Sequence, residues 1–188
     1  MKFPKLHSVV DPTVYTDFPH GLRAGLSFIN IQKEFTYATN AHTLVRHKTS
    51  ELFNEEFYNS LPENGIILNA RMIAEICRRD TSKVVLGDGT IEMVKNGYSV
   101  LFVLPNRDDY HFPQYESVIP DIKDTKPVNE IAIKPHLLTD LYNAMGLNGE
   151  GIVMNLFAPT KAVLIRPNGE GSNYPSVVGI LMPIMIRS

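Results

Sequence analysis

Short apolar runs separated by turn-forming residues dominate the chain and predict a protein rich in β-strands. The segments that fit strands are 26–31, 35–39, 66–68, 83–86, 91–94, 99–104, 131–133, 151–157, 162–165 and 177–182. Asn96-Gly97, between two of these segments, is typical of a two-residue hairpin turn because both residues tolerate positive φ angles. We therefore expect mostly antiparallel sheet.

Two further segments have apolar residues at helical spacing. The two apolar stripes are Met72, Ile73, Ile76 and Cys77, and Leu137, Leu138, Leu141 and Met145. Asn69 is placed to cap the first helix, and Pro135 fits the first turn of the second, which Gly146 would end. A weaker pattern at 51–60 fits either a helix or a turn in a loop.

The two helical segments belong to an internal repeat. Residues 66–76 align with 131–141 without a gap: a strand, a short connection, an apolar stripe and an acidic residue coincide, and several strands follow each copy. This indicates a duplicated strand–helix–strands module. The charged segment 121–127 ends in proline and fits a linker, so we expect domains at 1–122 and 126–188.

Composition limits the classes of protein that fit. A hydrophobic content of 44% in 188 residues predicts a real core rather than general disorder. The net charge of -2 gives no global attraction to nucleic acid, so any DNA contact needs a local basic face. The first ten residues do not resemble a signal peptide, and no apolar run reaches the ~20 residues that span a bilayer. We expect a soluble cytoplasmic protein.

Residues with catalytic or metal-binding chemistry are scattered. The six histidines lie on different predicted elements without metal-ligand spacing, and the single cysteine, Cys77, lies on an apolar stripe. Asp108, Asp109 and His111 could form a carboxylate–histidine or cation site, but their loop offers no further carboxylate at a suitable spacing. We expect no metal, no cofactor and no enzymatic activity. An enzyme would require a deep polar pocket with paired titratable groups.

Three stretches carry a resemblance to a known family. Residues 38–44, Ala-Thr-Asn-Ala-His-Thr-Leu, resemble the Ala-Thr-Asp-Gly-His-Arg-Leu signature of the bacterial replicative sliding clamp, the β subunit of DNA polymerase III. Residues 112–120 are similar to the end of that family's middle domain, and residues 162–167 and 180–184 to the end of its last domain. The family's first domain and the first half of its last domain have no counterpart in this chain.

The resemblance implies an α+β, sliding-clamp-like fold, with antiparallel sheets and helices on one face, shortened relative to the family. Residues 1–122 would match the middle domain, and residues 126–188 half of the last domain. The implied function is that of a DNA replication or processivity factor, or a recruitment factor, which binds double-stranded DNA topologically and binds peptide motifs of polymerases or repair proteins.

The resemblance also implies a peptide-binding pocket between the middle and last domains. Carried over to this sequence, its residues are Leu22, Thr39, His42, Leu44, Pro120, Thr160, Ala162, Ile180, Met182 and Pro183. Most are apolar or small, which suits an extended peptide with aliphatic and aromatic anchors. The alternative is that several are ordinary strand core. Asn40, Ala41 and Thr43 replace the family's Asp, Gly and Arg, a change that affects the expected affinity for partners.

A basic cluster on and near the predicted helices is the candidate DNA contact. It consists of Arg71, Arg78, Arg79, Lys83 and Lys134. In sliding clamps such side chains face the phosphate backbone without reading sequence, so binding would be weak, non-specific and salt-sensitive. The alternative is a solvated helix face.

The third module, 128–188, has no sister half, so we expect its sheet to expose an unpaired edge. A second copy would cover that edge and make a homo-oligomer. The family's subunit has six half-domains and closes a ring as a dimer, so a chain with three would need four copies for an equal ring. The alternative is a clamp-derived interaction module, from a phage or mobile element, that forms no ring and binds no DNA.

Overall fold

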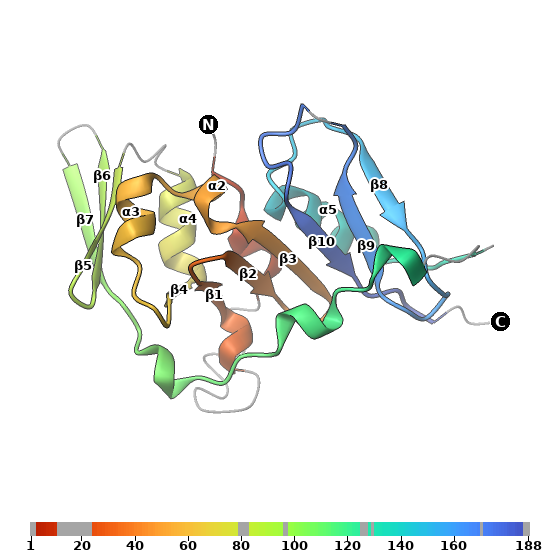
Figure 1. Ribbon diagram of the computed structural model, residues 1–188, viewed down its shortest axis with the longest axis horizontal. Helices are drawn as coiled ribbons and strands as arrows, with labels where there is room; N and C mark the ends of the chain where they lie inside the picture. Colours follow the sequence, from red (N-terminus) through yellow and green to blue (C-terminus); the bar gives the residue numbers. More distant parts are fainter. Residues whose placement is uncertain are drawn as a thin grey trace.

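Nine of the ten described strands form three antiparallel meanders of three strands each (Figure 1). The computed structural model describes residues 3–10, 24–78, 83–95, 98–124, 128, 130–169 and 171–185, with the backbone alone at 77, 78, 95 and 124. The first meander contains β1 (Phe28–Ile31), β2 (Phe35–Thr39) and β3 (Thr43–Lys48). The second contains β5 (Lys83–Gly87), β6 (Thr90–Lys95) and β7 (Tyr98–Val103). The third contains β8 (Ile152–Asn155), β9 (Val163–Pro167) and β10 (Val178–Leu181).

The first and third meanders share one sheet. β4 (Ile66–Asn69) pairs with β1, and β3 pairs with β10, which gives the seven-stranded order β4-β1-β2-β3-β10-β9-β8. The β3–β10 pairs run from Thr43↔Leu181 to Arg46↔Val178. The division into domains 1–122 and 126–188 stays a prediction, and hydrogen bonds cross it. The edge of the third module formed by β10 is therefore covered within the chain, contrary to our expectation. Among the described strands, β8 has no further neighbour and is the module's free edge.

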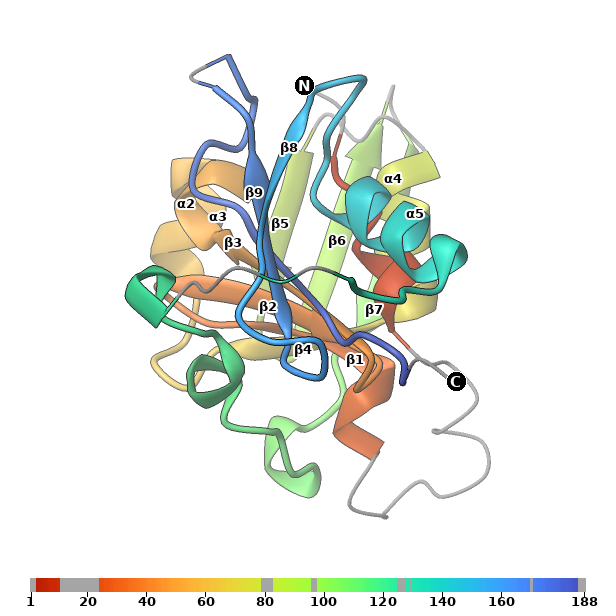
Figure 2. The same cartoon turned by 90° about the vertical axis from the view of Figure 1, so that its right-hand side faces the viewer.

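Two helices pack on one face of this architecture. α4 (Ala70–Arg78) and α5 (Pro135–Ala144) both contact the 3₁₀ helix η1 (Leu6–Val9), which lies between them in Figure 1, and Figure 2 shows both helices on the same side of the molecule. Apolar side chains of α4, α5 and η1 form one buried cluster with the inner faces of the strands. The predicted repeat is confirmed from the helix onward, because each copy places a helix before a three-stranded meander, but the leading strand forms only in the first copy, as β4. None of the described helices is long and apolar enough to cross a bilayer.

Local sequence signals set the ends of these helices. The Asn69 side-chain oxygen accepts a hydrogen bond from the Met72 N–H at 3.0 Å, as an N-cap does. Pro135 is the first residue of α5, where its missing N–H removes no helical bond. Gly146 follows α5 with φ +74°, a conformation that stops a helix and favours glycine. All three predictions are confirmed.

A long connection covers the opposite face of the seven-stranded sheet. Residues 105–124, here called the strap, run along one side of the molecule from β7 toward the third meander (Figure 1). The strap contains the short 3₁₀ helices η3 (Arg107–Asp109), η4 (Tyr115–Val118) and η5 (Ile122–Asp124). Tyr115 from the strap joins Tyr37 and Leu44 in a second buried cluster, which is separate from the helix-side core.

Five segments differ from the sequence prediction. Residues 43–48 form β3, although no strand was predicted there. Residues 131–133 form only an isolated bridge, Ala132↔Ile184, because their single neighbour is the short extended segment after β10. The 51–60 pattern forms two helices, α2 (Thr49–Leu52) and α3 (Glu55–Ser60), separated by extended backbone at Phe53. The 3₁₀ helix η2 (Ala24–Ser27) occupies the predicted start of the first strand. Part of the predicted linker is helical in η5, while 125–127 and the turn at 96–97 lie outside the described residues.

Candidate functional site

An apolar pocket of about 250 Å³ opens where β3 meets β10, on the strap side of the sheet. Its walls come from the β2–β3 turn, the end of β10 and the strap. The lining residues are Leu26, Thr39, Ala41, His42, Thr43, Leu44, Pro113, Tyr115, Val118, Ile180 and Met182. Most of these side chains are apolar, so the pocket suits an aliphatic or aromatic group better than a charged one.

The β2–β3 turn is held rigid by its own side chains. The Asn40 Oδ1 atom accepts hydrogen bonds from the backbone N–H groups of His42 (3.0 Å) and Thr43 (2.8 Å). The Thr39 hydroxyl donates to the Thr43 carbonyl at 2.6 Å and accepts from the Ala41 N–H at 3.1 Å. Ala41 has φ +71°, in the left-handed region that favours glycine. These bonds hold an alanine where the similar clamp signature has glycine.

The strap is fixed to the sheet beside the pocket by stacking and by ionic contacts. The Tyr115 ring stacks on Tyr37 with centroids 4.5 Å apart and an interplanar angle of 9°. The Tyr37 hydroxyl donates to one Glu116 carboxylate oxygen at 2.6 Å, and Arg46 Nη1 donates to the other at 2.8 Å. Burial, assisted by Glu116, raises the pKa of Tyr37, so its hydroxyl stays protonated and keeps donating. The Arg46 guanidinium also lies over the Phe35 ring at 4.4 Å.

The structure brings together five of the residues predicted for peptide binding. They are Thr39, His42, Leu44, Ile180 and Met182, and all line the pocket. Four others do not line it: Pro120, Thr160, Ala162 and Pro183. Thr160 is exposed, and Ala162 packs on the second core cluster instead. Leu22 lies outside the described residues.

Sequence reasoning missed the strap's contribution to the pocket. Pro113, Tyr115 and Val118 form one wall, and Leu26 and Thr43 contribute elsewhere. Residues 112–120 were recognised by resemblance, but only Pro120 was assigned to the pocket. The available signal was the aromatic and apolar content of a segment without regular pattern, which fits a connection packed on a sheet.

The predicted DNA-contacting residues are only partly described. Arg71 on α4 and Lys134 just before α5 are exposed on the elements that pack around η1. Lys83 lies 3.0 Å from the Glu56 carboxylate in an exposed ion pair, so its charge is partly matched. The side chain of Arg78, and Arg79 as a whole, lie outside the described part of the chain.

A second hollow and an acidic loop also carry polar side chains. The hollow, about 490 Å³, lies between the start of β4, the β5–β6 turn and residues 104–108. None of the residues predicted for peptide or DNA binding lines it, but Asp108 does. Asp108 and Asp109 lie in η3, where Asn106 binds the backbone N–H of the first and the carboxylate of the second. Among the described residues, no group of three or more His, Cys, Asp or Glu side chains could hold a metal ion.

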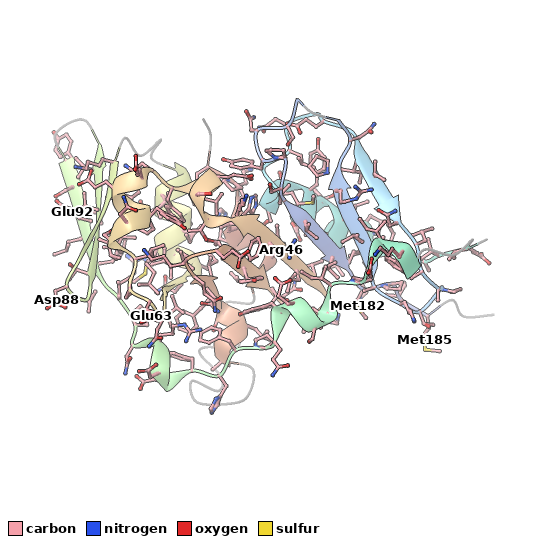
Figure 3. All side chains as sticks on the ribbon, viewed as in Figure 1. Arg46, Glu63, Asp88, Glu92, Met182 and Met185 are labelled. Atoms are coloured by element: carbon pink, nitrogen blue, oxygen red, sulfur yellow. The ribbon has the colours of Figure 1, made fainter. Side chains whose placement is uncertain are left out.

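Figure 3 shows how the labelled side chains are distributed. Met182 and Met185 lie near the same end of the molecule, beyond β10, while Asp88 and Glu92 lie on the three-stranded sheet at the opposite end. Arg46 lies between them on β3. The apolar pocket and the second sheet are therefore well separated.

Comparison with known proteins identifies the fold. No family model and no curated protein sequence matches this chain. A Helicobacter pylori β clamp in complex with diflunisal matches 97% of this chain and 62% of its own, with a TM-score of 0.64 and 12% identity. A Bacillus subtilis DNA polymerase sliding clamp matches 98% and 64%, with a TM-score of 0.62 and 14% identity. The β subunit of DNA polymerase III from Thermotoga maritima matches 97% and 63%, with a TM-score of 0.57 and 13% identity. This chain therefore has a shortened sliding-clamp fold, and spans less than two thirds of the length of these clamps.

Proposed function

We propose, from its sliding-clamp fold, that this chain is a recruitment factor that holds an extended apolar segment of a partner protein in the pocket beside β10. The observation that carries the proposal is the apolar pocket at the junction of β3 and β10. It has a rigid turn on one side and an anchored strap on the other, so little order has to be gained on binding.

The surface around the pocket supports a peptide rather than a small polar ligand. Val118 and Met182, which line the pocket, are 50% and 39% exposed. Exposed apolar side chains beside a pocket are typical of a surface that binds another protein. An extended segment could place one side chain in the pocket and lay its neighbours over the rim.

A matched pair of methionine variants tests this proposal. Met182→Arg places a charge in the pocket wall, whereas Met185→Arg makes the same change at a residue that is 80% exposed and does not line the pocket. The probe is a short fluorescein-labelled peptide with leucine and phenylalanine anchors, followed by fluorescence polarisation. We expect Met182→Arg to weaken binding at least ~10-fold and Met185→Arg to leave it unchanged.

Equal affinities in both variants, or no binding by the parent chain, would contradict the proposal. Carprofen is a useful competitor, because a Helicobacter pylori β clamp has been found in complex with it. Displacement of the labelled peptide by carprofen in the parent chain, and its absence in Met182→Arg, would support a shared apolar site.

A second candidate function is topological DNA binding by an assembly of copies. It is favoured by the placement of α4 and α5 on one face, where Arg71 and Lys134 are exposed. With so few charges and a net charge of -2, direct affinity would be weak and would fall steeply with salt. Encirclement, for which four copies would match the family's ring, would hold the protein on DNA without strong contacts.

Retention on circular and linear DNA tests this second function. A ring remains on nicked circular plasmid and slides off after linearisation. Arg71→Glu with Lys134→Glu should reduce loading, and Lys48→Glu with Lys161→Glu, two exposed lysines on other elements, should not. Equal retention on both DNA forms would exclude encirclement. Peptide binding without retention on circular DNA would favour the alternative function, an interaction module that forms no ring.

A further inference from the structure

β7 forms an open edge at one end of the molecule (Figure 1). Within the described part of the chain, β6 is its only strand neighbour. The Leu104 N–H donates to the Gly89 carbonyl at 2.9 Å. With the register of the two strands, this bond shows that the backbone N–H and C=O groups of the even-numbered residues of β7 point toward β6. Because bonding directions alternate in an antiparallel ladder, the N–H and C=O groups of Ser99, Leu101 and Val103 point outward.

This edge lacks the features that usually prevent strand addition. β7 has the sequence Tyr-Ser-Val-Leu-Phe-Val, with no charged residue and no proline. Tyr98, Leu101 and Val103 are 78%, 63% and 76% exposed. Natural proteins protect exposed edges with charges, prolines or bulges, so an uncharged edge with exposed apolar side chains indicates a surface that is covered by another strand.

The other free edges are less suited to pairing. In β8, the Asn168 N–H donates to the Gly151 carbonyl at 2.9 Å, so only Ile152 and Met154 point their backbone groups outward within this strand. The Glu150 carbonyl, next along that edge, accepts from the Tyr142 hydroxyl at 3.0 Å. β4 is largely buried, and β5 packs against α3.

We propose that β7 pairs with β7 of a second copy of this chain, antiparallel and around a two-fold axis at Leu101. In this register Leu101 faces the partner's Leu101, and Ser99 faces the partner's Val103, so the outward backbone groups of all three residues are matched. Both sheets keep the same face toward their helices, because the two-fold axis is perpendicular to the sheet. Each exposed Tyr98 ring lies next to Leu104 of the other copy, which is half-buried.

Because the strand carries no charged residue, two copies can pair without electrostatic repulsion between their side chains. It is also the same kind of joint that the chain already contains, where β3 and β10 link two meanders edge to edge. The inference does not depend on the peptide pocket, which lies near the other end of the molecule.

Sedimentation velocity over a range of concentrations, with charge-swap variants, tests the inference on the full chain. The parent should form a dimer. Leu101→Lys places two ammonium groups opposite each other across the axis and should raise the dimer dissociation constant at least ~10-fold, as should Leu101→Glu. An equimolar mixture of the two variants should restore the dimer, because residue 101 faces itself only in this register. Met185→Lys, an equal change at an exposed residue elsewhere, should leave dimerisation unaltered.

A monomer at all concentrations, or a Leu101→Lys chain that still dimerises, would overturn the inference. Loss of the dimer in both variants without recovery in the mixture would overturn the two-fold register, as would open-ended polymers. Far-UV circular dichroism of each variant shows that the fold is intact. Peptide binding by these variants should equal that of the parent, so failure of either proposal is recognised separately.

Discussion

At the scale of single residues, His47 links two elements that are distant in sequence. It is fully buried on β3, and its Nε2 atom donates to the Ala144 carbonyl at the end of α5 over 2.8 Å. Its ring meets Tyr174 edge to face with centroids 5.1 Å apart. Burial lowers the pKa of His47 to about 4, so the imidazole is neutral in the folded chain at neutral pH.

This residue gives a pH-dependent stability with a defined direction. Above the ordinary pKa of 6.5, folded and unfolded chains both carry neutral His47, and its contribution is fully present. Between pH 6.5 and about 4 only the unfolded chain binds the proton, so the free energy of unfolding falls by up to ~1.4 kcal/mol per pH unit. Urea unfolding at pH 7 and pH 5 measures this fall. It should be much smaller in His47→Gln, and unchanged in the exposed-site control His42→Gln.

Residue-level features were predictable where they depend on neighbours in sequence. The Asn69 cap, Pro135 and Gly146 act on backbone groups within a few residues, so the local sequence is enough to predict them. The roles of His47 and Tyr115 depend on contacts with segments 97 and 78 residues away, as the numbering of their partners Ala144 and Tyr37 shows. No local pattern reports such contacts.

At the scale of elements, a glycine sets the distance between α5 and the sheet. A Cβ atom on Gly179 in β10 would lie 2.7 Å from the Met145 sulfur and 3.2 Å from two side-chain carbons of Leu141. The missing side chain therefore allows the helix to pack directly on the strand that joins the two meanders. This close packing also supports the strand that carries Ile180 into the pocket.

Gly179→Ala should lower the free energy of unfolding by ~1–3 kcal/mol, because Met145 and Leu141 must move in a packed core. Gly171→Ala is the matched control, since a Cβ there would meet nothing within 4 Å. Chemical denaturation of both variants measures the difference. An equal effect at the two positions would show that the α5–β10 contact is looser than the structure indicates.

Elements were predictable from hydrophobic periodicity, and their boundaries from turn residues. Except for β3, which was not predicted, the strands of the three meanders and both longer helices follow the expected order. The prediction of a strand at 131–133 was wrong because an apolar run forms a strand only when a neighbouring strand supplies a ladder of hydrogen bonds. Here the only pairing described is a single bridge between Ala132 and Ile184. The 3₁₀ helices of the strap, such as η4, are too short to produce a periodic signal.

At the scale of the whole molecule, the β3–β10 joint makes one sheet from the two predicted domains. The helix-side core also draws residues from both, including Ile73 and Leu141. The pairing of β3 with β10 was not visible in the pattern of either strand, because any two antiparallel strands with apolar faces look compatible. Only the resemblance to clamps placed these segments near each other.

Because hydrogen bonds and core cross the predicted boundary, we expect the chain to unfold in one cooperative transition. Far-UV circular dichroism, which follows the backbone, and near-UV circular dichroism, which follows the tyrosines, should give the same urea midpoint and slope. Two resolved transitions would show that the domains 1–122 and 126–188 unfold independently despite the shared sheet.

The assembly of the pocket from both ends of the sequence has a consequence during synthesis. Its walls include Leu26 and Thr39, which leave the ribosome early, and Ile180 and Met182, which leave about 140 residues later. A nascent chain has no complete binding site until β10 has emerged and docked on β3. A partner of the proposed pocket would therefore meet a complete site only after that docking step.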